Sequence, residues 1–167
     1  MIRNGKSLLE AAPIKDMLDG KQRSGGVTYG LGEGGYDIRI LQEVEFTYER
    51  NNRIVRVWQD DENHSATLGN FTLASSMEYF EMPTDLLGIV HDKSTWARQG
   101  LSVFNTVLEP GFRGGLTLEL VYHGQTELII PAGAGIAQVV FHQLSQKASY
   151  SGKYQDQSSA PEPARFE

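Results

Sequence analysis

The chain has 167 residues and a formal net charge of −6 at pH 7, and its length predicts one domain over residues 1–167 with a core of its own. It has no cysteine, which excludes disulfides, thiolate metal sites and cysteine nucleophiles and fits a cytoplasmic location. An acidic chain lacks the basic face of a general nucleic-acid binder, and without an apolar run of about 18 residues or an apolar signal core we expect no membrane partner and no secretion.

The first twenty residues predict a helical segment that packs on the outside of a sheet. Ser7 and Glu10 have the spacing of a capping box, and apolar residues recur at roughly helical intervals between residues 8 and 18. Pro13 splits this stretch into two, because proline is tolerated in the first turn of a helix but not in its interior. Gly20 is the expected end. We therefore predict a helix over residues 7–18.

From Gly25 onward the pattern is typical of a mainly β chain, a barrel or a sandwich. The 18 glycines exceed the usual share of about 7% and indicate many tight turns. Those between residues 25 and 35 match neither the dinucleotide-binding fingerprint nor the P-loop, so we interpret them as turns. Residues 36–40 alternate, which places Asp37 and Arg39 on the face opposite the apolar side chains. The expected strands are 36–40, 44–48, 54–58, 71–73, 86–90, 101–104, 116–121, 127–130 and 136–144.

Residues 92–119 are the stretch richest in reactive groups. Residues 93–99 predict one or two helical turns, in which Ser94 and Arg98 share a face. In the strand 116–121, three leucines occupy one face and Glu119 lies on the other. A carboxylate in a closed pocket is a good general base for activating water. Glu119 is therefore the candidate base, and Ser94 and Arg98 could hold the water or the substrate atom that it attacks.

Several other chemistries lack support in the sequence. The four histidines are dispersed, and no HExxH or GxSxG motif occurs. Without cysteine, the signature of the zinc nucleoside deaminases cannot be present. After Ser145 the periodicity stops, so residues 145–167 are either a frayed end or a lid. The residues that suit closure over a ligand are Tyr150, Lys153, Tyr154, Gln155 and Gln157.

Six segments together resemble the dCTP deaminase branch of the dUTPase-like superfamily. They are GYDIRI, EYFEMPTDLLGIV, DKSTWARQGL, LEPGFRGGLTLEL, IPAGAGIAQVVF and YSGKYQDQ, and the likeness runs from about residue 29 to residue 157. The resemblance implies a distorted β-barrel or jelly-roll-like subunit with a short N-terminal helix, and a homotrimer with shared active sites. It also implies zinc-independent conversion of dCTP to dUTP and ammonia, with Mg²⁺ held through the triphosphate and no metal ligand from the protein.

The same resemblance assigns roles to residues of this chain. It implies that Glu119 is the catalytic glutamate and that Ser94 and Arg98 are catalytic groups that position the water and Glu119. It implies substrate contacts by Lys93, Thr95, Glu109, Tyr150, Lys153 and Gln157. Of these, Lys93 would meet phosphate, Glu109 would contact the deoxyribose 3′-hydroxyl, and the last three would close on the triphosphate as part of the 145–167 lid.

Two departures from the family leave alternatives open. Glu109 stands where the family has aspartate, and the hairpin between Arg98 and Glu109 is shorter than in the enzymes of the family. The first alternative is a dUTP diphosphatase, or a bifunctional enzyme that takes dCTP to dUMP. The second, motivated also by Thr95, is a catalytically weak nucleotide sensor built on the same trimer.

Overall fold

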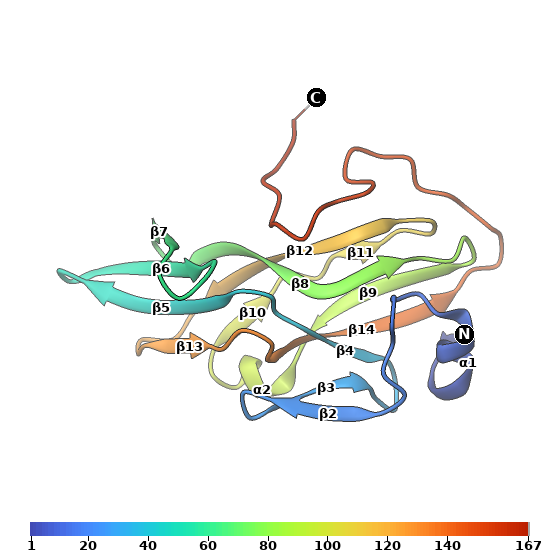
Figure 1. Ribbon diagram of the computed structural model, residues 1–167, viewed down its shortest axis with the longest axis horizontal. Helices are drawn as coiled ribbons and strands as arrows, with labels where there is room; N and C mark the ends of the chain where they lie inside the picture. The colour runs from blue at the N-terminus through green and yellow to red at the C-terminus, as the bar shows by residue number, and fades with distance from the viewer. Residues whose placement is uncertain (167) are drawn as a thin grey trace.

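The computed structural model describes residues 1–166 (Figure 1). Residues 1–166 form two short helices and fourteen strands. Their bounds are β1 (Ile2–Arg3), α1 (Gly5–Ala11), β2 (Lys21–Ser24), β3 (Val27–Leu31), β4 (Tyr36–Arg39), β5 (Glu43–Glu49), β6 (Asn52–Trp58), β7 (His64–Leu68), β8 (Phe71–Glu81), β9 (Leu86–Asp92), α2 (Ser94–Ala97), β10 (Leu101–Val103), β11 (Val107–Leu108), β12 (Arg113–Tyr122), β13 (Leu128–Ile130) and β14 (Gly135–Gln143). Neither helix is long and apolar enough to cross a membrane within residues 1–166.

The strands form three antiparallel sheets. The largest runs β11-β9-β14-β4-β3-β2, with β1 paired to β14; the second is β10-β12-β8 and the third β13-β5-β6-β7. Figure 1 shows the β5–β6 hairpin reaching out to one side of the molecule. The prediction of a mainly β chain with a short N-terminal helix is confirmed, but the sheets described over residues 1–166 do not close into a barrel.

One hydrophobic core draws side chains from all three sheets. The alternating faces of the strands supply it, with fully buried Ile38 on β4, Phe46 on β5, Phe80 on β8, Leu118 on β12 and Phe141 on β14. Burying one such side chain stabilises the fold by about 1.5–3 kcal/mol. Because β12 gives its leucines to this core, the side chains between them must face outward.

The N-terminal helix is shorter than predicted. Asn4, not Ser7, is the N-cap of α1, and the hydroxyl of Ser7 donates to the carbonyl of Asn4. The helix ends at Ala12, which has a left-handed φ of 47° because the residue before Pro13 disfavours helical geometry. Beyond Pro13, Ile14 forms an isolated antiparallel bridge with Phe80 of β8, and the chain then turns at residues 15 and 16. The prediction of a helix over residues 7–18 is therefore wrong after residue 11.

Five strands described within residues 1–166 are missing from the sequence prediction: β1, β2, β3, β7 and β11. Gly25 and Gly26 do form a tight turn, with φ values of 56° and 78°, but they join β2 and β3 into a hairpin. Two glycines with positive φ suit a two-residue hairpin turn. The strand β7 lies at the edge of its sheet and is exposed along its whole length. Strand β8, expected only over residues 71–73, extends to Glu81.

A buried ion pair ties β4 to β8. The Nε of Arg39 donates to Oε1 of Glu78 at 2.8 Å, and the backbone N–H of Arg39 donates to Oε2 at 2.8 Å. The guanidinium also lies 4.6 Å from the centre of the Tyr29 ring. Burial raises the pKa of the Glu78 carboxyl, and the hydrogen bonds from Arg39 offset only part of that rise. Arg39 thus joins two sheets rather than facing solvent.

Candidate active site

A cavity of about 390 Å³ lies between the outer face of β12, the turn after β11 and the C-terminal tail. Figure 1 shows the tail running over β11 and β12. The volume falls in the range of small-molecule sites, about 300–1,000 Å³. The residues that line the cavity are Phe71, Leu73, Thr106, Val107, Leu108, Glu109, Phe112, Leu116, Thr117, Glu119, Tyr150, Tyr154, Gln157, Glu162, Pro163 and Ala164.

Glu119 projects from β12 into this cavity. Its neighbours Leu118 and Leu120 are buried in the core, so the alternation of the strand fixes its direction. In the adjacent strand β8 its partner is Leu73, which also lines the cavity. Burial raises the pKa of the Glu119 carboxyl, and a hydrogen bond from its own backbone opposes this. A carboxylate with a raised pKa accepts a proton more readily, as a general base must.

Glu109 lies at the rim of the same cavity. It starts a tight turn in which the N–H of Phe112 donates to the Glu109 carbonyl at 3.1 Å. Gly111 adopts a φ of 76°, which favours glycine, and Phe112 returns the chain to the core. Glu109 itself is exposed, so its carboxylate can reach a ligand from the rim.

The predicted lid residues Tyr150 and Gln157 pack against their own chain. The ring of Tyr150 lies 6.2 Å from that of Phe112, edge to face. Gln157 is buried, and its side-chain amide donates to Oγ1 of Thr117 at 3.1 Å. The N–H of Gly115 donates to the carbonyl of Gln157 at 3.1 Å. The tail therefore lies along the first residues of β12, and it closes one side of the cavity.

Two glycines make room for the tail. A Cβ atom on Gly114 would lie 2.7 Å from the backbone nitrogen of Gln157, and one on Gly115 would lie 2.6 Å from the carbonyl oxygen of Ser158. Gly114 also has a φ of 141°. Any larger residue at either position would push the tail away from β12.

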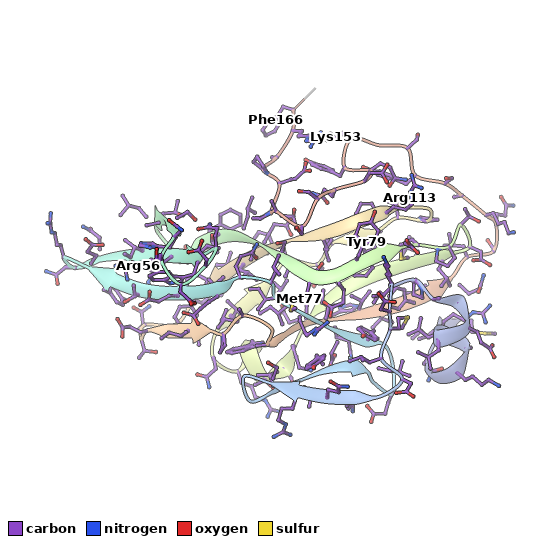
Figure 2. All side chains as sticks on the ribbon, in the orientation of Figure 1. Arg56, Met77, Tyr79, Arg113, Lys153 and Phe166 are labelled. Atoms are coloured by element: carbon purple, nitrogen blue, oxygen red, sulfur yellow. The ribbon has the colours of Figure 1, made fainter. Side chains whose placement is uncertain are left out.

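The end of the chain enters the site, which the sequence did not predict. Glu162, Pro163 and Ala164 line the cavity, and the N–H of Glu162 donates to Oγ1 of Thr117 at 3.0 Å. Lys153 does not line the cavity. Its ammonium donates to the carbonyl of Arg165, whose guanidinium donates to the Lys153 carbonyl at 2.7 Å. Figure 2 shows Lys153 on the outer side of the tail, close to the end of the chain.

The other predicted residues lie around α2, away from the cavity. Ser94, Thr95 and Arg98 are exposed, and none of them lines it. In Figure 1, α2 and the tail are at opposite sides of the molecule. Within one chain, the structure brings together Glu119, Glu109, Tyr150 and Gln157, and it leaves the α2 residues apart.

Two buried side chains anchor α2. The ammonium of Lys93 is paired with Oδ2 of Asp37, and the Trp96 indole donates to the carbonyl of Gly135 at 2.7 Å. Asp37 is only 4% exposed, and its Oδ1 has no hydrogen-bond partner within the described residues. The sequence placed Asp37 on the outer face of a strand, whereas the structure uses it to bind Lys93 across 56 positions.

Over residues 1–166, no three histidine, aspartate or glutamate side chains lie close enough together to hold a metal ion. Glu109 and Glu119 both line the cavity. Mg²⁺ can take most of its ligands from phosphate oxygens and water, so such an ion would need no cluster of protein ligands here.

The fold of this chain is similar to that of solved dUTPase and dCTP deaminase structures. The chain superposes on the dUTPase of EIAV with a TM-score of 0.52 at 15% identity, covering 86% of this chain and 92% of that one. It superposes on the dCTP deaminase of Agrobacterium tumefaciens with a TM-score of 0.57 at 13% identity, covering 85% and 48%. These likenesses show a dUTPase-like fold, as the sequence predicts.

The sequence comparisons then give the family. Residues 9–144 match the family model described as dCTP deaminase-like. The dCTP deaminase of Campylobacter jejuni strain RM1221 is 36% identical, over 95% of this chain and 92% of the relative. That of Sulfurovum sp. strain NBC37-1 is 37% identical, over 95% and 91%. The chain belongs to the dCTP deaminase-like family, so the resemblance found in the sequence is confirmed.

Proposed function

We propose that this protein is a hydrolase that converts dCTP and water to dUTP and ammonia. The observation that carries the proposal is Glu119, held in a cavity of nucleotide-binding size on the outer face of β12, with its pKa raised by burial. Its relatives, at 36–37% identity over nearly the whole chain, are dCTP deaminases.

The reaction needs one group that takes a proton and later returns it. Glu119 accepts a proton from water while the oxygen adds to C4 of the cytosine ring. The same carboxyl then gives its proton to the exocyclic nitrogen, the C4–N bond breaks, and ammonia leaves. Since the chain has no cysteine, the zinc ligands of the nucleoside deaminases are missing, and we propose that Glu119 activates water without zinc.

The cavity of a single chain is incomplete for a triphosphate. None of its lining residues within residues 1–166 is lysine or arginine, whereas Glu109, Glu119 and Glu162 are acidic. Ser94 and Arg98 are exposed at a distant helix, where a second copy could present them. We infer a homotrimer in which α2 of one subunit completes the site of its neighbour. Thr95 belongs to the same exposed turn and is a proposed substrate contact.

Tyr150, Lys153 and Gln157 are the proposed triphosphate contacts of the tail. Because the Lys153 ammonium is bound to the carbonyl of Arg165, that bond must break before Lys153 can reach a phosphate. Lys93 is paired with Asp37, so its phosphate contact stays a prediction. When bound, Mg²⁺ neutralises phosphate charge, and Glu109 is the residue at the rim that could hold its water shell. A cytoplasmic location likewise stays a prediction.

One observation favours the bifunctional alternative. Glu109 is exposed at the rim of the cavity that holds Glu119, so a second carboxylate is available to orient water towards a phosphate. The reaction would then continue from dUTP to dUMP and pyrophosphate. A nucleotide sensor with the same fold would bind the triphosphate and release nothing.

Product chromatography separates these functions. The protein is incubated with Mg²⁺ and dCTP, and separately with Mg²⁺ and dUTP. We expect dUTP and ammonia from dCTP and no change in dUTP. Formation of dUMP from either substrate would establish the bifunctional or diphosphatase reaction instead. Tight binding of both nucleotides without any product would overturn the enzyme assignment in favour of the sensor.

A further inference from the structure

Two exposed phenyl rings lie beside the proposed base. Phe71 on β8 is 44% exposed and Phe104, just after β10, is 51% exposed. Their ring centres are 6.2 Å apart, and the rings are inclined at 32°. Large apolar side chains are usually covered in a folded protein, and two adjacent exposed rings next to a cavity indicate a surface that another molecule covers.

The strand register places both rings on the face of the sheet that carries Glu119. In β8, Leu73 is opposite Glu119 and Phe71 is opposite Val121. On the other side of β12, Val103 is opposite Leu120, so the next residue, Phe104, stands opposite Glu119. The N–H of Phe104 donates to the Glu119 carbonyl at 3.0 Å, which confirms this register. Side chains directly opposite one another in a sheet have Cβ atoms about 4.5–5.5 Å apart.

The chemistry of this wall fits one part of a nucleotide. The proposed reaction brings C4 of the ring, through one water molecule, to the Glu119 carboxylate. Glu119 has two neighbours across the sheet, Leu73 on β8 and Phe104 after β10, and Phe104 is the one with an aromatic face. A charged phosphate group gains nothing from a phenyl face, whereas a planar, uncharged base stacks on it.

We propose that Phe104, backed by Phe71, is the stacking wall that holds the pyrimidine ring against Glu119 and so contributes to the choice of a base-bearing substrate. This inference rests on the proposed function, since it requires that the cavity binds a pyrimidine nucleotide. Phe71 itself lines the cavity, and Phe104 extends the same surface from it.

The other molecule that could cover these rings is a second copy of the chain. The two occupants make different demands. If a base stacks on Phe104, loss of the ring weakens the binding of nucleotides and leaves the binding of inorganic phosphates unchanged. If Phe104 is a subunit contact, loss of the ring changes the oligomeric mass, whether or not a nucleotide is present.

The test measures binding in the Glu119→Gln variant, which keeps the shape of the site and is expected to turn dCTP over at least about a hundredfold more slowly. Dissociation constants for dCTP and for inorganic tripolyphosphate, both with Mg²⁺, are measured by calorimetry with and without Phe104→Ala. Light scattering gives the oligomeric mass of each variant. Phe104→Tyr keeps the aromatic face, and Leu68→Ala removes an apolar side chain that is 77% exposed on β7, away from the cavity.

We expect Phe104→Ala to weaken dCTP binding about 5- to 150-fold, as for loss of one base–aromatic stack. Tripolyphosphate binding and oligomeric mass should stay the same, Phe104→Tyr should restore dCTP affinity, and Leu68→Ala should change nothing. Unchanged dCTP affinity in Phe104→Ala would overturn this inference alone, and so would an equal loss for tripolyphosphate or a changed oligomeric mass. If the Glu119→Gln protein binds neither dCTP nor dUTP, the proposed function falls, and this inference falls with it.

Discussion

Replacing Glu119 by glutamine tests the proposed base directly. Glutamine has nearly the same shape, so the packing against Leu73 and the strand register should persist while the proton acceptor is lost. General-base catalysis contributes about 10²- to 10⁴-fold, which corresponds to about 3–5.5 kcal/mol of transition-state stabilisation. We therefore expect kcat for ammonia release from dCTP to fall by that factor while dCTP still binds.

The same substitution has a second, independent consequence for stability. Burial raises the pKa of the Glu119 carboxyl in the folded protein above the unfolded value of about 4.3. The folded state therefore binds the proton more tightly, and this contribution is fully present below pH of about 4.3 and is lost as the pH rises through the folded pKa. Glutamine does not titrate, so Glu119→Gln should gain melting temperature relative to the parent as the pH rises from 4 to 8.

Two measurements test these predictions for Glu119→Gln, one of turnover and one of melting temperature. Ammonia release is followed with a coupled assay between pH 5 and 9, and melting curves are recorded over the same range and down to pH 4. Glu109→Gln is the matched control, because it removes the other carboxylate that the sequence placed at the site and leaves Glu119 in position. Undiminished turnover in Glu119→Gln would refute Glu119 as the base. A melting-temperature difference that does not depend on pH would refute the buried, proton-binding carboxyl.

Three further predictions concern the frame around the site. Arg39→Ala leaves the buried Glu78 carboxylate unpaired and should lower the free energy of unfolding, measured in urea, by about 3–5 kcal/mol. The double variant that also removes the Glu78 side chain should lose less, and equal losses in the single and double variants would contradict the ion pair. Thr117→Val removes the acceptor for Gln157 and Glu162, and should speed hydrogen exchange in the tail by a factor of about 5–30 for one or two bonds at about 1 kcal/mol each, with the core unchanged. Gly115→Ala places a methyl group against the Ser158 carbonyl and should make the tail the first site of limited proteolysis; a cleavage pattern like that of the parent would show that the tail does not need this close approach.

Much of the fold could be predicted because burial leaves a pattern in the sequence. The leucines of β12 alternate with outward residues, so the strand and the direction of Glu119 could both be inferred. Strand β7 has no buried face and therefore shows no alternation. The end of α1 depended on the left-handed conformation of Ala12, which no apolar pattern records. Local periodicity thus predicts elements that pack on the core and misses those held by edge pairing alone.

Some residues of the candidate site could likewise be predicted from the sequence, and others could not. Glu119, Glu109 and the tail residue Gln157 could be proposed from motif and strand direction, and the structure gathers them around one cavity. The pairing of Lys93 with Asp37 joins residues 56 positions apart, and it depends on β14, which pairs with β4 on one side and with β9, the strand before Lys93, on the other. Glu162 lies in a stretch without periodicity, so its place in the cavity follows only from the path of the tail.

The way the tail is attached also determines how often the cavity is open. Between residues 155 and 157, the tail is bonded to β12 by the Asp156 N–H to Arg113 O bond at 2.8 Å, the Gly115 N–H to Gln157 O bond at 3.1 Å, and side-chain bonds from Arg113 N to Gln155 and from Gln157 to Thr117. These four bonds, at about 0.5–1.5 kcal/mol each, contribute about 2–6 kcal/mol to the docked state before the entropy of ordering the tail is subtracted. If the net value is about 3 kcal/mol, the tail is released in roughly one molecule in a hundred, and a nucleotide that enters only past the released tail associates slower by about the same factor. The bonds that dock the tail, one of them on Thr117 in the wall of the same cavity, therefore set how fast a nucleotide can enter.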